Sequence, residues 1–290
     1  MKTINSLMVC IDLSDTDDRL VEQALLWANI FPECNRLILF HNIRAEFLNE
    51  TLPLSKENIN KLMSNILAST KKRFANLIAD KPIDWDIMVT FEPNSAKAIV
   101  DTSIKHNSSL LVMGKKRPGR GTGVIAQSVM ALDKSCTPVL LVPPTKSVGI
   151  NKVACCAELS IDEKPMFDFA LKLHEQLDTE NQCLHVYKLP LAYFPYMEQN
   201  DQALEDATQK RAQERFKSFK KQAKLDGELW ELVLRKGVQI ADTVAIYAKE
   251  QALDLVIITR SGKNTPATYR VGSNAKKLMR TSIGIPMLIL

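Results

Sequence analysis

Apolar and polar positions along the first half of the chain predict strands and helices in turn. Uninterrupted apolar runs, typical of strands buried on both faces, lie at 7–11, 37–41, 110–113 and 138–142. Apolar residues recur at helical spacing from Leu20 to Ala28, over 55–78 and over 95–106, and a short helix is expected near Ser128. Residues 83–91 alternate strictly, which favours a strand at a sheet edge. This order predicts an α/β fold with a doubly wound, five-stranded parallel sheet.

The same pattern then starts again with different residues. Four pairs of positions mark the repeat, at offsets of 146, 144, 145 and 145: Asp12 and Glu158, His41 and His185, Trp85 and Trp230, Gly114 and Thr259. A nearly constant shift across unrelated residue types predicts an internal duplication of about 145 residues. We therefore expect two tandem domains, 1–146 and 147–290, joined near 145–150.

Composition narrows the class of protein. Of the 290 residues, 46% are hydrophobic and 24% are charged, which suffices for two ordinary cores. The net charge of +5 arises from 38 basic and 33 acidic residues, a balance too mixed to favour a nucleic-acid partner. The main basic cluster, 115–117 with Arg120, has no interleaved aromatic residues, and nucleic-acid binding there would depend strongly on salt.

The chain start and the cysteines indicate a cytoplasmic protein. The first apolar segment is soon interrupted by acidic residues, so neither a signal peptide nor a membrane anchor is expected. No apolar run approaches the roughly 18 residues of a membrane span. The six cysteines show no C-x-x-C spacing and form no metal-ligand pattern with the four histidines. Buried, reduced thiols are the simplest interpretation.

One stretch of the second half carries candidate chemistry. Thr259 and Gly262 follow the apolar run 255–258, and Gly272-Ser273-Asn274 opens a predicted helix. Backbone N–H groups between a strand and a helix can converge on an anion, and glycines there allow close approach and positive φ. Turn chemistry without a ligand explains the same glycines. The sequence thus leaves a phosphate site and a plain turn as alternatives.

Shifting this motif back by 145 gives its counterparts in the first half. They are Gly114, Arg117, Gln127 and Ser128. The register is not constant there, because Ser128 precedes Pro138 by 10 residues whereas Ser273 precedes Pro286 by 13. A deletion therefore lies within the first-half segment. Arg117 and Gln127 add bulk where the second half has glycines, although an arginine can itself bind phosphate.

Each half resembles the universal stress protein domain, and the whole chain resembles the tandem two-domain members of that family. ATP-binding members carry G-x2-G-x9-G-[S/T] after the fourth strand and an Asp at the end of the first. The resemblance implies a Rossmann-like fold of the adenine-nucleotide alpha hydrolase type. It also implies that the last strands, 139–142 and 287–290, pair within the chain as a pseudo-dimer, with further homodimerisation an open question.

The resemblance also implies where an adenine nucleotide would bind. The second half keeps Gly262, Gly272 and Ser273, with Thr259 for the first glycine and Glu158 for the family's Asp. The backbone after the second strand contacts adenine in the family, which here involves Val186 and, in the first half, Asn42. We expect ATP, with Mg²⁺ as its companion ion, in the second half. The first-half site with Asp12 is expected to be degenerate, and Asp12 could equally be a helix N-cap.

The leading functional hypothesis is a stress-response protein that binds an adenine nucleotide without dedicated catalysis. One alternative is a nucleotide-free scaffold that acts through protein partners, for which the predicted helix at 200–225 offers a face. Another is a weak ATPase or other adenine-nucleotide-dependent enzyme. No P-loop Gly-Lys-Ser/Thr, His-x-Gly-His or Ser-Gly-Gly-x-Asp-Ser sequence is found. His41 and His185 are interpreted as partly buried, hydrogen-bonded residues rather than catalysts, and no metal ligand set is predicted.

Overall fold

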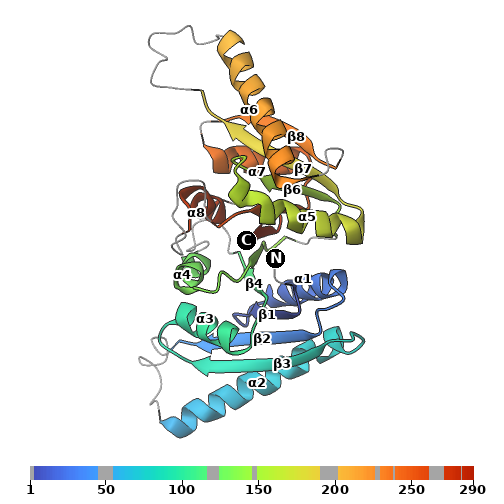
Figure 1. The fold of residues 1–290 in the computed structure, drawn as a ribbon. Coiled ribbons are helices and arrows are strands. Elements are labelled where there is room, and N and C mark those ends of the chain that lie inside the picture. The colour runs from blue at the N-terminus through green and yellow to red at the C-terminus, as the bar shows by residue number, and fades with distance from the viewer. Residues whose placement is uncertain are drawn as a thin grey trace. The chain divides into compact units, whose positions relative to one another are not determined.

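The fold was obtained as a computed structural model that describes most of the chain in two compact units (Figure 1). One unit lies within residues 2–146 and the other within residues 147–290. The described residues are 3–44, 55–115, 124–145, 149–189, 202–225, 229–237, 239–260, 271–281 and 283–290.

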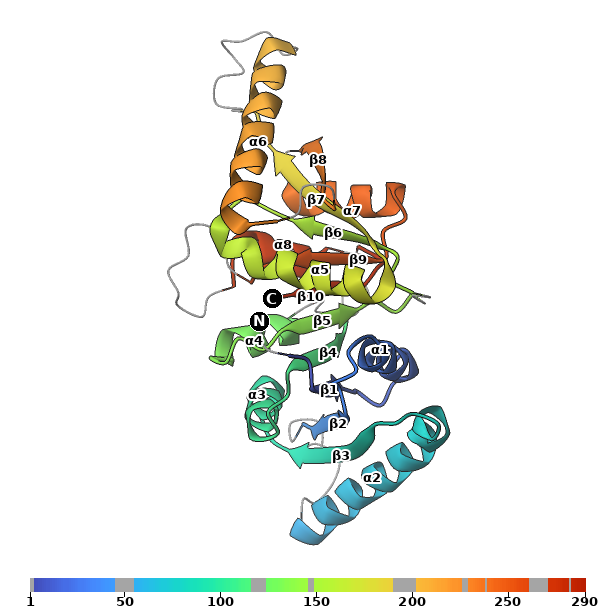
Figure 2. The same cartoon turned by 45° about the vertical axis from the view of Figure 1, so that its right-hand side comes forward.

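The first unit is a parallel sheet covered by helices. Its elements are β1 (Ser6–Cys10), α1 (Asp17–Ile30), β2 (Arg36–Ile43), α2 (Lys56–Ile78), β3 (Asp84–Phe91), α3 (Ser95–Lys105), β4 (Leu110–Gly114), α4 (Val124–Leu132) and β5 (Val139–Val142). The strand order is β3-β2-β1-β4-β5, with every pair parallel. Figure 2 shows α1 and α2 on one face of this sheet and α3 and α4 on the other.

The second unit repeats that topology. Its elements are β6 (Lys152–Cys156), the 3₁₀ helix η2 (Ile161–Glu163), α5 (Lys164–Leu177), β7 (Glu180–Tyr187), α6 (Gln202–Ala223), β8 (Glu231–Lys236), α7 (Ile240–Glu250), β9 (Leu255–Ile258), α8 (Ser273–Arg280) and β10 (Met287–Ile289). The order is β8-β7-β6-β9-β10, again parallel throughout. The predicted doubly wound fold is therefore confirmed.

Strand register also follows the duplication. His41 of β2 pairs with Val89 of β3, and His185 of β7 pairs with Leu234 of β8. These pairs are 144 and 145 positions apart, as the sequence offsets require. Strand β3 is the edge strand of its unit, which explains why its residues alternate, whereas the central strands carry runs of consecutive buried apolar residues.

Aromatic packing ties the second helix of the second unit to its sheet. Phe167 of α5 is fully buried, and its ring centroid lies 4.9 Å from that of Phe219 on α6 and 4.6 Å from that of Trp230. Edge-to-face ring pairs at such distances add to the stabilisation from burial. These three residues form the core under α6.

The cysteine thiols differ sharply in their surroundings. Cys155 and Cys183 are fully buried on neighbouring strands, and burial raises the pKa of both thiols. Burial also raises the pKa of the Cys10 and Cys156 thiols to about 12. Cys136, in the loop before β5, is exposed. All six cysteines are free, but the expectation that they are buried is wrong for Cys136.

Cys136 is therefore expected to be the fast-reacting thiol. The thiolate is the nucleophile, so a raised pKa and burial slow every other cysteine of the native chain. Labelling with a chromogenic disulfide at pH 8 should modify about one thiol per chain within minutes and the rest only after unfolding. The variant Cys136→Ser should lose the fast phase. A fast phase that survives this substitution would contradict the assignment.

Among the helices that the structure describes, none combines the length and the apolar character needed to cross a membrane.

Candidate functional site

In each unit the strand order reverses between two central strands, which is where doubly wound sheets bind ligands. The reversal falls between β1 and β4 in the first unit and between β6 and β9 in the second. Asp12 follows β1 and Gly114 is the last residue of β4 in one unit, and Glu158 follows β6 and Thr259 follows β9 in the other. These four sequence-predicted residues therefore lie at the expected edge of each sheet.

The second unit brings Glu158 and Asn274 into direct contact. The Asn274 Nδ2 atom donates to Glu158 Oε1 at 2.9 Å, across 116 residues of sequence. Asn274 is the second residue of α8, and Glu158 follows β6 by two residues. The acid after the first strand of this unit and one residue of the motif after its fourth strand are thus in contact.

The amino end of α8 has the form of an anion site without an internal cap. Gly272 is the N-cap residue, no side chain caps the helix, and Ser273 opens its first turn. The Gly272 N–H donates to the Arg260 carbonyl at 2.8 Å. Gly272 has φ −60°, so the expectation of a positive φ is wrong at this residue. Gly262 lies outside the described residues.

Two further predicted residues of the second unit, Thr259 and Val186, belong to different strands or strand ends. Thr259 directly follows β9 and is half-buried. Val186 is half-buried within β7, where it pairs with Arg235 of β8. Val186 therefore lies within β7, which ends at Tyr187, and not after the strand as expected.

A buried carboxylate shapes the loop that carries Glu158. Glu163 Oε1 accepts the Glu158 N–H at 2.9 Å, and Oε2 accepts the Ser160 N–H at 3.0 Å. Only 3% of the Glu163 side chain is exposed, and burial raises the pKa of its carboxyl above the usual range. Glu163 therefore fixes the backbone on which Glu158 is presented.

In the first unit, a buried aspartate holds the backbone of the corresponding loop in the same way. Asp17 Oδ1 accepts the Asp12 N–H at 3.1 Å, and Asp17 is 1% exposed. Burial raises the pKa of its carboxyl to about 6. The sequence analysis missed this pair, although Asp17 and Glu163 are 146 positions apart, the offset already seen for Asp12 and Glu158.

The loops after β1 and β6 also share a backbone conformation and a hydrogen bond from a histidine. Leu13 and Leu159 have φ of 65° and 61°, the left-handed region that leucine rarely adopts. His41 Nδ1 donates to the Ile11 carbonyl at 3.0 Å, and His185 Nδ1 to the Ala157 carbonyl at 2.8 Å. Both histidines are half-buried. Their interpretation as partly buried, hydrogen-bonded residues is confirmed.

An arginine from the second helix of each unit also holds this loop. Arg73 of α2 donates from Nη2 to the Ser14 carbonyl at 2.9 Å. Arg215 of α6 donates from Nη2 to the Glu158 carbonyl at 2.5 Å. These two contacts span 59 and 57 residues, so no local pattern in the sequence indicates them.

The predicted first-unit residues are engaged in structural roles. Asp12 is exposed, and its Oδ1 accepts the Ser14 N–H at 3.3 Å. Thr16, not Asp12, is the N-cap residue of α1, so the N-cap alternative for Asp12 is wrong. The Asn42 amide donates to the Glu92 carbonyl and to Ser95 Oγ, both at 2.9 Å, and its oxygen accepts the Thr90 hydroxyl at 2.8 Å.

Gln127 and Ser128 do not take the positions of Gly272 and Ser273. Ser128 lies inside α4, where its Oγ donates to the Val124 carbonyl at 3.0 Å, whereas Ser273 is the first residue of α8. The helix ends Leu132 and Arg280 are 148 positions apart, as are the starts of β5 and β10. The three-residue deletion thus lies before α4 ends, and the shift of 145 is wrong there. Arg117 lies outside the described residues.

A buried cation follows the fourth strand in both units. Lys115 is 5% exposed and Arg260 is 7% exposed. Burial lowers the pKa of the Lys115 ammonium group to about 8. The backbone N–H of Lys115 donates to the Val142 carbonyl at 2.7 Å, and that of Arg260 donates to the Leu290 carbonyl at 2.6 Å. Each unit thus has a buried basic residue within two positions of the end of its fourth strand.

Within the described ranges, no group of three or more His, Cys, Asp or Glu side chains is arranged to hold a metal ion.

The fold and this edge of the sheet define a class, the doubly wound proteins that present a binding crevice where the strand order reverses. The universal stress protein family model matches residues 149–289. The second unit therefore belongs to the universal stress protein family. No curated protein sequence matches the chain closely enough to count as a relative.

Solved structures share the fold over nearly the whole chain. A universal stress protein from Archaeoglobus fulgidus DSM 4304 is 14% identical, with a TM-score of 0.70 over 99% of this chain and 96% of that one. A universal stress protein from Pseudomonas aeruginosa UCBPP-PA14 is 12% identical, with a TM-score of 0.66 over 99% and 93%. The cytoplasmic domain of a prokaryotic cation chloride cotransporter matches at 10% identity and a TM-score of 0.54, covering 99% and 95%. At these identities the likeness concerns the fold alone.

Proposed function

We propose that the chain is a stress-response protein whose second domain, within 147–290, binds an adenine nucleotide without dedicated catalysis. The observation that carries this proposal is the contact between Glu158 and Asn274 at 2.9 Å. It unites the strand-end acid with the glycine motif where the strand order reverses. The first domain, within 1–146, would serve as a degenerate partner.

The residues present fit a nucleotide in two respects. The first turn of α8 has no side-chain cap, so its N–H groups and the helix dipole suit a phosphate. Glu158 offers a carboxylate oxygen to a ribose hydroxyl, and Asn274 can rotate its amide toward the same group. ATP with Mg²⁺ is the ligand we propose, and the phosphates would supply the ligands that bind the ion.

One observation favours the nucleotide-free scaffold as a second candidate. The Glu158 carboxylate lies against the first turn of α8 through Asn274, and a negative charge there already complements the helix amino end. A phosphate would have to share this region with the carboxylate. The two candidates differ in whether the purified protein carries a bound nucleotide.

The test is to denature freshly purified protein and identify any released small molecule by mass. We expect about one adenine nucleotide per chain. Gly272→Val should release none, because its side chain would occupy the space of the phosphates. Since Gly272 has φ −60° and ψ 155°, which any residue adopts, the variant should fold normally.

Gly114→Ala is the matched control in the first domain. A Cβ at Gly114 would meet only the Leu20 side chain, at 3.6 Å, so the variant should keep both fold and nucleotide. If wild type releases nothing and added Mg-ATP causes no thermal shift, the scaffold candidate stands. Turnover of ATP well above background would instead assign an enzymatic role.

A further inference from the structure

A hollow lies in the second unit, next to the loop that carries Glu158. It has a volume of about 350 Å³ and lies between Leu159 of that loop and one flank of α6. This volume is within the range of small-molecule sites. The Glu158 side chain faces Asn274, whereas its carbonyl group faces Arg215 at the rim of the hollow. The hollow is therefore separate from the proposed nucleotide site.

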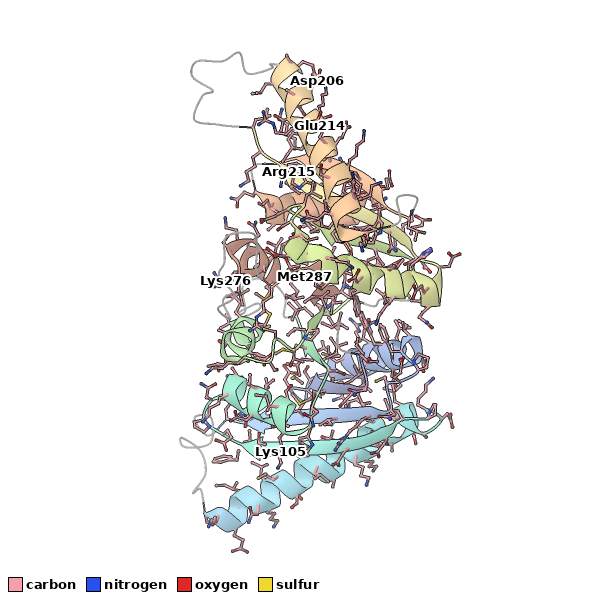
Figure 3. All side chains as sticks on the ribbon, viewed as in Figure 1. Lys105, Asp206, Glu214, Arg215, Lys276 and Met287 are labelled. Atoms are coloured by element: carbon pink, nitrogen blue, oxygen red, sulfur yellow. The ribbon has the colours of Figure 1, made fainter. Side chains whose placement is uncertain are left out.

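The helix flank of this hollow consists mainly of hydrogen-bond donors. Arg211, Arg215, Ser218 and Gln222 follow one another at intervals of four, three and four residues, so they share one flank of α6. Phe219 contributes the apolar part of the lining. Figure 3 labels Arg215 and its neighbour Glu214, the one acidic residue of the lining. Two guanidinium groups against a single carboxylate leave the hollow positive.

The arginines are available to a ligand. Within the described part of the chain, Arg211 makes no ion pair or hydrogen bond, and it is exposed. Arg215 donates from one nitrogen to the Glu158 carbonyl, and its other donors make no further contact with described residues. A guanidinium group presents five donors in a planar fork that suits phosphate oxygens.

A stripe of lysines runs beside this flank. Lys210, Lys217, Lys221 and Lys224 are exposed and lie opposite the buried face of α6, which Ala212, Phe216, Phe219 and Ala223 form. Charges of one sign beside a hollow raise the local concentration of an oppositely charged ligand. Phe216 and Phe219 are only 5% and 3% exposed, so they offer little ring surface for a nucleobase to stack on.

We propose that this hollow binds a small anion that carries two or more phosphate groups, held by Arg211 and Arg215. Two guanidinium groups one helical turn apart match two linked phosphates better than a single carboxylate. The Ser218 hydroxyl and the Gln222 amide supply further donors on the same flank. Anion binding in this hollow does not require a nucleotide at Asn274.

The test is calorimetric titration of the full chain with inorganic pyrophosphate at low salt. Wild type should bind with a Kd of about 1 mM or below. Arg211→Gln should weaken binding about tenfold or more, because the bidentate contact is lost. Lys221→Gln removes the same charge from the same helix outside the hollow, and should weaken binding less than about threefold. The loss caused by Arg211→Gln should be the same in a Gly272→Val background, where the proposed phosphate site at α8 is blocked, which separates the two sites.

Three outcomes would overturn the proposal. The first is no binding of pyrophosphate up to about 10 mM, ten times the weakest Kd expected. The second is an equal loss in Arg211→Gln and Lys221→Gln, which would show a diffuse attraction to the basic helix. The third is that a single-stranded oligonucleotide binds with steep salt dependence and pyrophosphate does not displace it.

Discussion

Replacing Phe167 by alanine is expected to lower the free energy of unfolding of the second unit by about 3–5 kcal/mol. Phe167 is fully buried, and its ring packs on both Phe219 and Trp230. The substitution removes the transfer free energy of a whole ring and leaves a cavity beneath α6. Urea unfolding, followed by hydrogen exchange of peptides from β6 and β7, measures the loss in this unit.

Two further variants calibrate that result. Phe167→Leu keeps most of the buried volume and should cost less than half as much as the alanine variant. Ile246→Ala, on α7 of the same unit, removes a side chain that is 58% exposed and should change stability by about 0.5 kcal/mol or less. A loss below about 1 kcal/mol in Phe167→Ala would show that α6 does not depend on this cluster.

Replacing Asp17 by asparagine is expected to stabilise the protein above pH 6 and to have little effect near pH 4. Burial raises the pKa of the Asp17 carboxyl from 3.8 to about 6 in the folded chain. Between these values the unfolded chain loses the proton while the folded chain keeps it, so the contribution of Asp17 to stability falls as pH rises. Two pKa units correspond to about 3 kcal/mol. Asparagine keeps an oxygen for the Asp12 N–H but does not ionise.

The measurement is the stability difference between Asp17→Asn and wild type at several pH values from 4 to 7. The difference should grow by about 1–3 kcal/mol across this window and then stay constant. Glu163→Gln should show the same sign in the second unit, since burial raises that carboxyl pKa as well. A difference that does not change with pH would contradict the account of the buried carboxyl.

The fold could be predicted because its signals are local. Each buried strand contains an apolar run in the sequence. Ser55 directly precedes α2, whose N-cap it forms, and the alternation of apolar and polar residues lies within β3 itself. The duplication added a check on every element, because each had to occur twice at one offset. Where the offset changed, between β4 and β5, the assignment of Gln127 and Ser128 failed.

The site was only partly predictable because its supporting contacts are not local. Asn274 could be named from its motif, but its bond to Glu158 spans 116 residues. Arg73 and Arg215 are two of many basic residues on amphipathic helices, and only the fold shows that they reach the same loop. The burial of Asp17 and Glu163 likewise depends on the helices packed over them, which a pattern of single residues does not reveal.

The residues that hold the loops after β1 and β6 affect how a duplicated protein of this kind can evolve. The backbone is held by Asp17 or Glu163, by His41 or His185, and by an arginine of the second helix, none of which is a predicted ligand contact. After a duplication, one copy can lose its ligand chemistry by drift while selection for folding keeps the loop intact. Asp12 and Glu158 differ on backbones that the same kinds of group support. A duplicated loop can thus keep its shape in both halves while its ligand-contacting residues change in one.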